Sequence, residues 1–364
     1  MEVRATKVTF VLLLIATIAC REAPVLPEAE AAKKVEQRLW EAGASIFIPM
    51  EYEIFRNSLR IARIREIHEK NRFFLFRKLD GIKAEYQRIL AQGEKLLQII
   101  EERREEKETA LFSSLQEVEN LLSRLRVICL SINESQRIRQ RITGAEVLIA
   151  VAQQKIAKKK YQEAEQSLFL ARQQAASARQ IVIRLFERYV DENYLNLWQK
   201  LAQETITDSK REKSLAIIVD KLERKLILYS GGEIKSIYNV GLGRFSLADK
   251  IHAGDEATPE GKYKIIKKIP TSKYYKALLL NYPNEDDWRR FAEMKKRGLI
   301  PPQVGIGGLI EIHGGGQDGL THGCIAMENE AIDELFRIVE VGTPVTIVGT
   351  LKRDSLILKL VKEL

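Results

Sequence analysis

Apolar side chains recur along residues 111–185 in alternating steps of four and three positions. This spacing places them on one stripe of an α-helix, and a narrow stripe of this kind packs against a partner helix. Pro49 is the only proline between Pro27 and Pro259, which favours long uninterrupted helices. We therefore predict an all-α helical bundle or coiled-coil hairpin over residues 29–207. Its stripes are Leu111, Leu115, Val118, Leu122, Leu125, Cys129 and Ile132, then Ala145, Ile149, Ala152 and Ile156, and then Ala164, Leu168, Ala171, Ala175, Ala178, Val182 and Leu185.

Turn-forming residues divide this helical part. Three consecutive lysines at residues 158–160 predict a turn, and Gly93, Asn133 and Gly144 are candidate breaks. Residues 145–179 resemble one tetratricopeptide-type helical hairpin. A stacked solenoid needs several such copies, so a plain coiled-coil pair is the favoured interpretation.

The pattern changes to short β-like runs near residue 209. The polar, charged residues 205–214 mark the boundary, and Gly231 with Gly232 predicts a hairpin turn. The fold class is therefore α+β and multidomain, with a mostly β domain at residues 215–350 and a C-terminal strand or tail at residues 351–364. The predicted strands cover residues 216–219, 225–229, 234–240, 261–266, 277–280, 309–313, 344–348 and 355–360, with helices at 286–296 and 329–339.

Residues 1–20 are typical of an export signal. Arg4 and Lys7 precede an apolar run at residues 8–19, which is too short to span a bilayer. A tether follows at residues 21–28. Cys20 allows two outcomes: ordinary signal cleavage before it, or lipidation of Cys20 as in a bacterial lipoprotein. We expect an exported protein of the periplasm or cell envelope, which is membrane-anchored if Cys20 is lipidated.

Charge and cysteine usage narrow the candidate chemistry. The net charge is +9, and residues 215–364 hold 22 Lys+Arg against 20 Asp+Glu, so the basic excess belongs to the N-terminal part. No basic stretch alternates with aromatic residues, so nucleic acid is not an expected partner. The three cysteines do not form an expected disulfide, because Cys20 lies in the leader and Cys129 lies on a helical stripe. Cys324 alone lies in a polar, glycine-rich loop, where a thiol is accessible.

The segment at residues 310–327 (IEIHGGGQDGLTHGCIAM) contains the candidate chemistry. Alternation along its strand directs Ile310 and Ile312 to the core, and it places His313 on the opposite face. A thiol attacking a carbonyl needs a base and donors for the oxyanion, and this segment supplies both beside Cys324. A cysteine acyl-transfer enzyme is therefore the leading hypothesis.

Metal and cofactor alternatives are weaker. His313, His322 and Cys324 are zinc-binding types and His252 could supply a fourth ligand, but their spacing matches no zinc pattern. Residues 241–243 (GLG) lack the third glycine of a dinucleotide-binding fingerprint. We expect no metal and no cofactor.

Residues 215–350 resemble the L,D-transpeptidase catalytic domain, the YkuD-like family of bacterial cell-wall enzymes. The resemblance rests on the order and spacing of four short motifs. These are residues 258–263 (TPEGKY), 312–314 (IHG), 321–325 (THGCI) and 342–345 (GTPV).

The resemblance implies a β-rich, sandwich-like fold and assigns roles to matching residues. Cys324 is expected to be the nucleophile and His313 its general base. The backbone carbonyl of Gly314 is expected to orient the ring, and His322 is expected to support the oxyanion together with the backbone of Gly323.

The implied donor is a peptidoglycan tetrapeptide stem. Attack after its third residue releases D-alanine and leaves a thioester, which an amine of a second stem resolves. Thr321 and Tyr282 are the expected substrate-binding residues.

Two departures leave the acceptor open. Many members of the family have Arg or Asn where this chain has Ala326, and the loop between His313 and Cys324 is short. Separately, residues 280–284 (LNYPN) resemble a subset of the family that includes hydrolases. The alternatives are therefore a hydrolase with the same Cys/His site (an L,D-carboxypeptidase, or an amidase or endopeptidase on wall-linked peptides) and a non-catalytic envelope scaffold. The helical part is expected to bind an envelope protein.

Overall fold

The computed structural model describes residues 25–130, 132, 135–317 and 321–364. The predicted export signal, Cys20 and the candidate break at Asn133 lie outside these residues. By backbone contacts the chain divides into an N-terminal unit, residues 1–113, and a C-terminal unit, residues 114–364. The boundary lies inside one long helix, so the division at residues 29–207 and 215–350 stays a prediction. Within the described residues, no helix is both long and apolar enough to cross a membrane.

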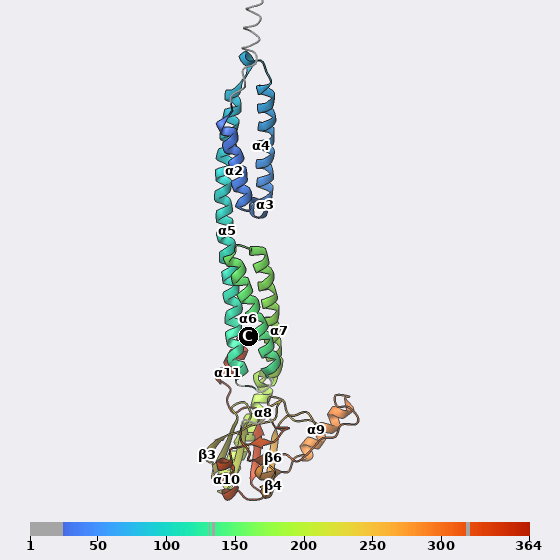
Figure 1. The fold of residues 1–364 in the computed structure, drawn as a ribbon. Helices are drawn as coiled ribbons and strands as arrows, with labels where there is room; N and C mark the ends of the chain where they lie inside the picture. Colours follow the sequence, from blue (N-terminus) through green and yellow to red (C-terminus); the bar gives the residue numbers. More distant parts are fainter. Residues whose placement is uncertain (1–24, 131, 133–134, 318–320) are drawn as a thin grey trace, which may run out of the picture. The chain divides into compact units, whose positions relative to one another are not determined.

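The N-terminal unit is a helical bundle around one apolar core. Val35 and Phe55 are among the buried residues that join its helices. A side-chain carbon at Gly93 would lie 2.3 Å from Val35, so this glycine allows close helix packing and the predicted break there is wrong. The elements are α2 (Pro27–Glu41), α3 (Ala44–Phe47), α4 (Pro49–Lys70), η1 (Phe74–Phe76) and the first part of α5 (Leu79–Leu130), as Figure 1 shows.

The predicted helical stripes lie in the C-terminal unit from Leu115 onward, and Leu111 lies just before its boundary. Every residue of the three stripes is buried except Leu185, whose place on the stripe Phe186 takes. The lysine turn separates two helices that lie side by side (Figure 1), so the antiparallel hairpin is confirmed. Gly144 lies inside a helix, so the predicted break there is wrong. The helices are the rest of α5, α6 (Gln136–Ala157), α7 (Tyr161–Val190), α8 (Glu192–Glu212) and α11 (Leu356–Lys362).

Helix α11 corrects the predicted strand at residues 355–360. Leu356, Leu358 and Leu360 alternate as in a strand, but Ser355 caps a helix by accepting a hydrogen bond from the Leu358 N–H at 3.3 Å. Leu358 and Val361, three residues apart, are the buried positions. The apolar run therefore follows helical spacing, and the helix packs against α7.

An eight-stranded mixed sheet forms the rest of the C-terminal unit, in the order β3-β2-β1-β8-β4-β5-β6-β7. The β1–β8 and β6–β7 pairs are parallel, and the others are antiparallel. The strands are β1 (Leu215–Asp220), β2 (Lys225–Ser230), β3 (Glu233–Asn239), β4 (Gly261–Ser272), β5 (Tyr275–Leu280), β6 (Glu311–His313), β7 (Ile325–Ala326) and β8 (Pro344–Val348), with helices α9 (Glu285–Lys296) and α10 (Asn329–Ile338).

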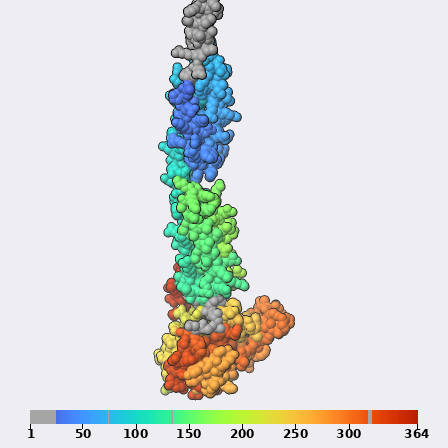
Figure 2. Space-filling model, viewed as in Figure 1, coloured from blue at the N-terminus to red at the C-terminus, as the bar shows by residue number. Residues whose placement is uncertain are grey.

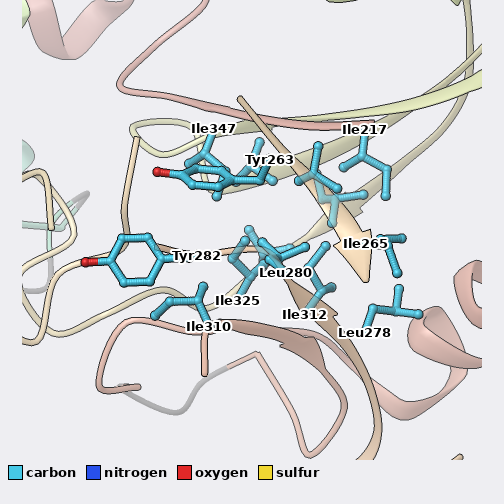
Figure 3. Packing of buried hydrophobic residues seen from close by; sticks show 14 of the residues in the cluster. Ile217, Tyr263, Ile265, Leu278, Leu280, Tyr282, Ile310, Ile312, Ile325 and Ile347 are labelled. Carbon is cyan, nitrogen blue, oxygen red and sulfur yellow. The ribbon is translucent and has the colours of Figure 1, made fainter. Parts of the chain in front are cut away.

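The two halves of the sheet face each other across one core. Strand β4 joins them, because its first residues pair with β8 and its later residues pair with β5. In Figure 3, Ile217 and Ile347 of one half lie opposite Leu280 and Ile325 of the other. The predicted fold class, a helical N-terminal part followed by a mostly β, sandwich-like domain, is confirmed. Figure 2 shows α9 and its following residues as an orange lobe that projects from this domain.

Candidate active site

Strand β6 positions His313 beside the end of β7. Ile312 pairs with Ile325 and His313 pairs with Ala326 in a parallel register. Ile312 and Ile325 are fully buried in the core. Because side chains alternate along a strand, His313 and the residue before Ile325 lie on the opposite face of these neighbouring strands. That residue is Cys324, so the structure brings the predicted pair to one face.

The His313 ring is held by a backbone carbonyl and an aromatic neighbour. Its Nδ1 lies 2.6 Å from the Gly314 carbonyl oxygen, and the Tyr274 ring stacks on it at 4.4 Å between centroids. Strand alternation predicted an exposed His313, but this residue is only 5% exposed because Tyr274 covers its ring. Burial lowers the pKa of His313, and the bond to Gly314 offsets this only in part. The imidazole is therefore neutral at neutral pH, with Nδ1–H as the donor and Nε2 as the basic nitrogen.

Gly314 is required by close packing. A side-chain carbon there would lie 2.7 Å from Asn329 Oδ1 and 3.1 Å from the Tyr274 carbonyl oxygen. Asn329 also accepts a hydrogen bond from the Gly315 N–H at 2.9 Å. The first residues of α10 and the loop after β6 therefore fix the carbonyl that holds the histidine.

Cys324 is half-buried and remains a thiol at neutral pH. Its Sγ donates to the Leu309 carbonyl at 3.6 Å. Burial raises the pKa of the Cys324 thiol, and a backbone hydrogen bond from Glu311 offsets this only in part. The second described cysteine, Cys129, is 4% exposed, and burial raises its pKa to about 11. The prediction of a core cysteine at Cys129 and a more accessible one at Cys324 is confirmed.

A tight turn presents Cys324. The Thr321 hydroxyl donates to the Cys324 carbonyl at 2.7 Å and accepts from the Gly323 N–H at 3.2 Å. Gly323 has φ +131°, and a side-chain carbon there would lie 2.6 Å from the Ala257 carbonyl oxygen. Only glycine fits this backbone without a shift. The Thr321 hydroxyl thus shapes the turn by bonding to both Gly323 and Cys324.

The other predicted site residues are placed differently. The His322 side chain is 86% exposed, and its Nδ1 lies 3.2 Å from Glu256 Oε1. Tyr282 is 5% exposed inside the sheet core, and its hydroxyl donates to the Ile306 carbonyl at 3.3 Å. The structure therefore brings His322 to the site surface and leaves Tyr282 in the core (Figure 3). Ala326 is also buried, where it exchanges backbone hydrogen bonds with Gly241.

A cavity of about 470 Å³ opens beside the thiol. Its wall carries both signs of charge, from Lys250, Lys273 and Glu311. Cys324, His322 and Tyr274 also line it, together with Ala253, Gly254, Ser272, Gly307, Gly308, Leu309 and Ile310.

Two buried ion pairs hold the loops around this cavity. Lys250 donates to Asp255 at 2.7 Å, and Asp255 also accepts from the Ile251 and His252 N–H groups at 2.6 and 2.9 Å. Lys221, whose side chain is fully buried, donates to the Ala248 and Thr258 carbonyls and to Glu260. The segment that abuts Gly323 is therefore fixed from both ends.

Helices α7 and α8 take part in the second ion pair. Arg188 of α7 donates to Glu260, and the Trp198 indole of α8 donates to the same carboxylate at 2.9 Å. Burial alone would raise the pKa of Glu260, but the charges of Lys221 and Arg188 outweigh it and hold the pKa below its ordinary value. Glu260 is thus an ionised link between these helices and the cavity loops.

Residues 214–347 match the family model of the L,D-transpeptidase catalytic domain, YkuD. The predicted resemblance is confirmed over this range. The chain is 33% identical over 132 residues to the "Putative L,D-transpeptidase YafK" of Escherichia coli (strain K12), a match covering 36% of this chain and 44% of that protein. It therefore spans less than half the length of this relative.

Two further similarities lie in the same part of the chain. The "Putative L,D-transpeptidase YqjB" of Bacillus subtilis (strain 168) is 26% identical over 132 residues, which cover 36% of this chain and 69% of that protein. The crystal structure of Mycobacterium tuberculosis L,D-transpeptidase 1 matches with 15% identity and a TM-score of 0.25, covering 37% of this chain and 62% of that one.

Sequence patterns did not identify several residues that shape the site in this domain. Tyr274 covers His313, and Lys221 reaches three loop groups from the end of β1. No local pattern marks either residue, because each acts on groups distant in the sequence. Glu260 lies in the motif at residues 258–263, but its hydrogen bonds to α7 and α8 depend on tertiary packing.

Proposed function

We propose that the chain is a peptidoglycan L,D-transpeptidase whose cavity beside Cys324 performs cysteine acyl transfer on a tetrapeptide stem. The observation that carries this proposal is the His313 arrangement. Its Nδ1 is bonded to the Gly314 carbonyl at 2.6 Å, and Cys324 lies on the same face of the adjacent parallel strand. A carbonyl that holds Nδ1–H leaves Nε2 to accept the thiol proton, which is the arrangement that nucleophilic cysteine catalysis needs.

The first half-reaction forms a thioester. Sγ of Cys324 attacks the carbonyl of the third stem residue while its proton passes to Nε2 of His313. The resulting oxyanion is stabilised by His322 and the backbone of Cys324, with Gly323 holding the turn. The tetrahedral intermediate collapses as the imidazolium donates its proton to the leaving amine, and D-alanine departs.

The second half-reaction reverses these proton movements. An amine of a second stem attacks the thioester carbonyl, and His313 accepts a proton from it. The new amide forms as the thiolate leaves and recovers the proton from the imidazolium. No net oxidation occurs, and the enzyme returns to its starting protonation state.

The protonation states favour a neutral starting pair. Burial lowers the pKa of His313 and raises the pKa of Cys324, so a preformed thiolate–imidazolium pair is disfavoured at neutral pH. The base therefore acts during the attack. Catalysis is expected to require neutral His313 and to decline as the pH falls through its lowered pKa.

The charged cavity wall suits a stem peptide. Lys273, whose ammonium lies 4.6 Å from the centre of the Tyr274 ring, is the proposed partner of a substrate carboxylate, whereas Lys250 is held by Asp255. Glu311 offers a carboxylate to a substrate amine, and a diamino acid residue carries groups of both kinds. Thr321 acts through the turn that it bonds, and peptidoglycan in the cell envelope is the proposed partner.

Incubation of the purified chain with disaccharide tetrapeptides tests this proposal. We expect release of D-alanine and formation of cross-linked dimers, both lost in Cys324→Ala and retained in Cys129→Ala. Tripeptides and free D-alanine without dimers would instead establish the hydrolase. Absence of D-alanine release with an intact fold would contradict the L,D-transpeptidase, and it would favour the scaffold if wall-linked peptides were not cleaved either.

A further inference from the structure

The loop between α4 and α5 combines basic and large apolar residues. Residues 70–78 read KNRFFLFRK, with four basic and no acidic side chains. Leu75 is 70% exposed, Phe76 is 63% exposed and Phe73 is 43% exposed. Large apolar side chains that gather in one exposed place mark an interaction surface, whereas isolated ones do not.

The loop is internally held, so these side chains have a defined support. Glu69 accepts hydrogen bonds from the Arg72 guanidinium and from the Lys78 N–H, each at 3.0 Å. Both bonds lower the pKa of Glu69, with the Lys78 bond as the larger cause. Arg77 Nε donates to the Arg72 carbonyl at 3.0 Å. The two ends of the loop are therefore tied together beneath its apolar residues.

The loop lies at the tip of the hairpin formed by α4 and α5 (Figure 1). The rings of Phe73 and Phe76 lie 6.2 Å apart between centroids. At a tip, a flat surface can reach Phe73, Leu75 and Phe76 together without contacting the sides of the helices. A partner helix would need a stripe along α4 or α5 instead, as in the α6–α7 hairpin.

We propose that residues 70–78 form an interfacial anchor that inserts into the headgroup region of an anionic lipid bilayer. Aromatic residues favour the boundary between headgroups and acyl chains, and basic residues beside them attract anionic lipids. Lys70 and Arg72 are paired with Glu66 and Glu69, so Arg77 and Lys78 supply the positive charge of the loop. This charge is complementary to an anionic membrane surface, which we take as the occupant. This anchor is independent of Cys324 chemistry and of lipidation at Cys20.

The path of the chain agrees with this orientation. Helix α4 runs back from α3 toward the loop, whereas α2 runs toward α3. The start of α2 therefore lies toward the same end of the bundle as the loop.

Vesicle binding by the full-length chain tests the anchor. The triple variant Phe73→Ser/Leu75→Ser/Phe76→Ser is compared with Phe112→Ser/Val147→Ser/Phe169→Ser, which replaces three exposed helix residues. We expect the loop variant to bind vesicles of phosphatidylglycerol and phosphatidylcholine at least about tenfold more weakly than wild type, and the control variant to bind like wild type. Equal binding by both variants would overturn the proposal.

Charge is tested in the same assay. Arg77→Gln/Lys78→Gln is expected to weaken binding about 25-fold, at roughly fivefold for each basic residue near an anionic surface. The matched variant Lys158→Gln/Lys159→Gln, in the α6–α7 turn, is expected to leave binding unchanged. Equal loss in both variants would show nonspecific attraction and contradict a local anchor.

Insertion is tested by fluorescence, which separates the loop from the apolar leader. Phe76→Trp is expected to add a tryptophan signal that brominated lipids quench. Trp40 lies near the C-terminal end of α2, about 30 Å away along the length of α4, and is expected to stay unquenched. An unquenched signal at position 76 would overturn insertion. A lipid-independent dimer lost in the triple serine variant would show that a second copy covers the tip instead.

Discussion

The α6–α7 hairpin and the loops around Cys324 reach close packing by different means. The hairpin uses a repeated apolar stripe that includes Ala145, Ala152 and Ala171, all fully buried. The loops use single hydrogen bonds, such as those of the buried Lys221 to two carbonyls and a carboxylate. A repeated stripe distributes its stabilisation over many residues, whereas the loops depend on a few buried polar groups whose hydrogen bonds are specific. The hairpin should therefore tolerate single changes that disable the site.

The largest expected difference concerns histidine. His313→Ala should lower turnover of tetrapeptide stems about 10³-fold, because the thiol loses its base. His68→Ala, on the exposed surface of α4, should leave turnover unchanged. Steady-state rates of D-alanine release measure both. A nearly active His313→Ala protein would remove this residue from the mechanism.

The second largest expected difference is between the contributions of a buried and an exposed ion pair to the free energy of unfolding. Lys221→Met should destabilise the chain by about 3–5 kcal/mol, because Glu260 loses a buried partner and two carbonyls lose their donor. Lys262→Met removes a largely exposed pair with Glu204 and should hardly change the melting temperature. Denaturant unfolding monitored by circular dichroism gives both values. Similar curves for the two variants would contradict the role given to the buried link.

Two glycines sharpen the comparison further. Gly323→Ala should lower turnover about 100-fold, because the new carbon meets the Ala257 carbonyl oxygen and the turn that presents Cys324 must move. Gly144→Ala meets nothing closer than 3.8 Å and should stabilise α6 by about 0.5–1 kcal/mol with unchanged turnover. Turnover and melting temperature are measured for each. A fully active Gly323→Ala enzyme would show that the turn adapts.

The smallest expected effect is at the helical cysteine. Cys129→Ser places a hydroxyl on the apolar stripe and should cost about 1–3 kcal/mol of stability while turnover stays at the wild-type level. Thermal unfolding and D-alanine release measure the two quantities. A loss of turnover in a folded Cys129→Ser protein would contradict its assignment to the core alone.

The same contrast explains what the sequence could predict. Local patterns in the sequence correctly predicted the apolar stripes, the lysine turn, and the alternation that puts Ile312 and His313 on opposite faces. The spacing of apolar residues gave a wrong prediction where it fits both a strand and a helix, as at Leu356, Leu358 and Leu360. It also predicted Leu185 as the buried residue of the last stripe, where Phe186 is buried instead.

The candidate site divides in the same way. Cys324, His313 and Gly314 follow from a short motif whose members are local in sequence. The cover of Tyr274 over His313 and the burial of Tyr282 depend on how β5 and its neighbours pack. Contacts between distant segments leave no periodic signal, so sequence patterns alone could not supply them.

The most direct test of the central claim is the pH dependence of Cys324 alkylation by iodoacetamide, read by mass spectrometry beside Cys129. The account predicts that Cys324 is alkylated faster than Cys129. It also predicts that the alkylation rate of Cys324 rises with pH below 6.5, the ordinary pKa of histidine, because the pKa of His313 is lowered and the ring becomes neutral there. In His313→Ala the rise should move above the ordinary cysteine value of 9.0, because only the thiolate then reacts. Identical profiles for wild type and His313→Ala, or equal labelling of the two cysteines, would contradict the proposed pair.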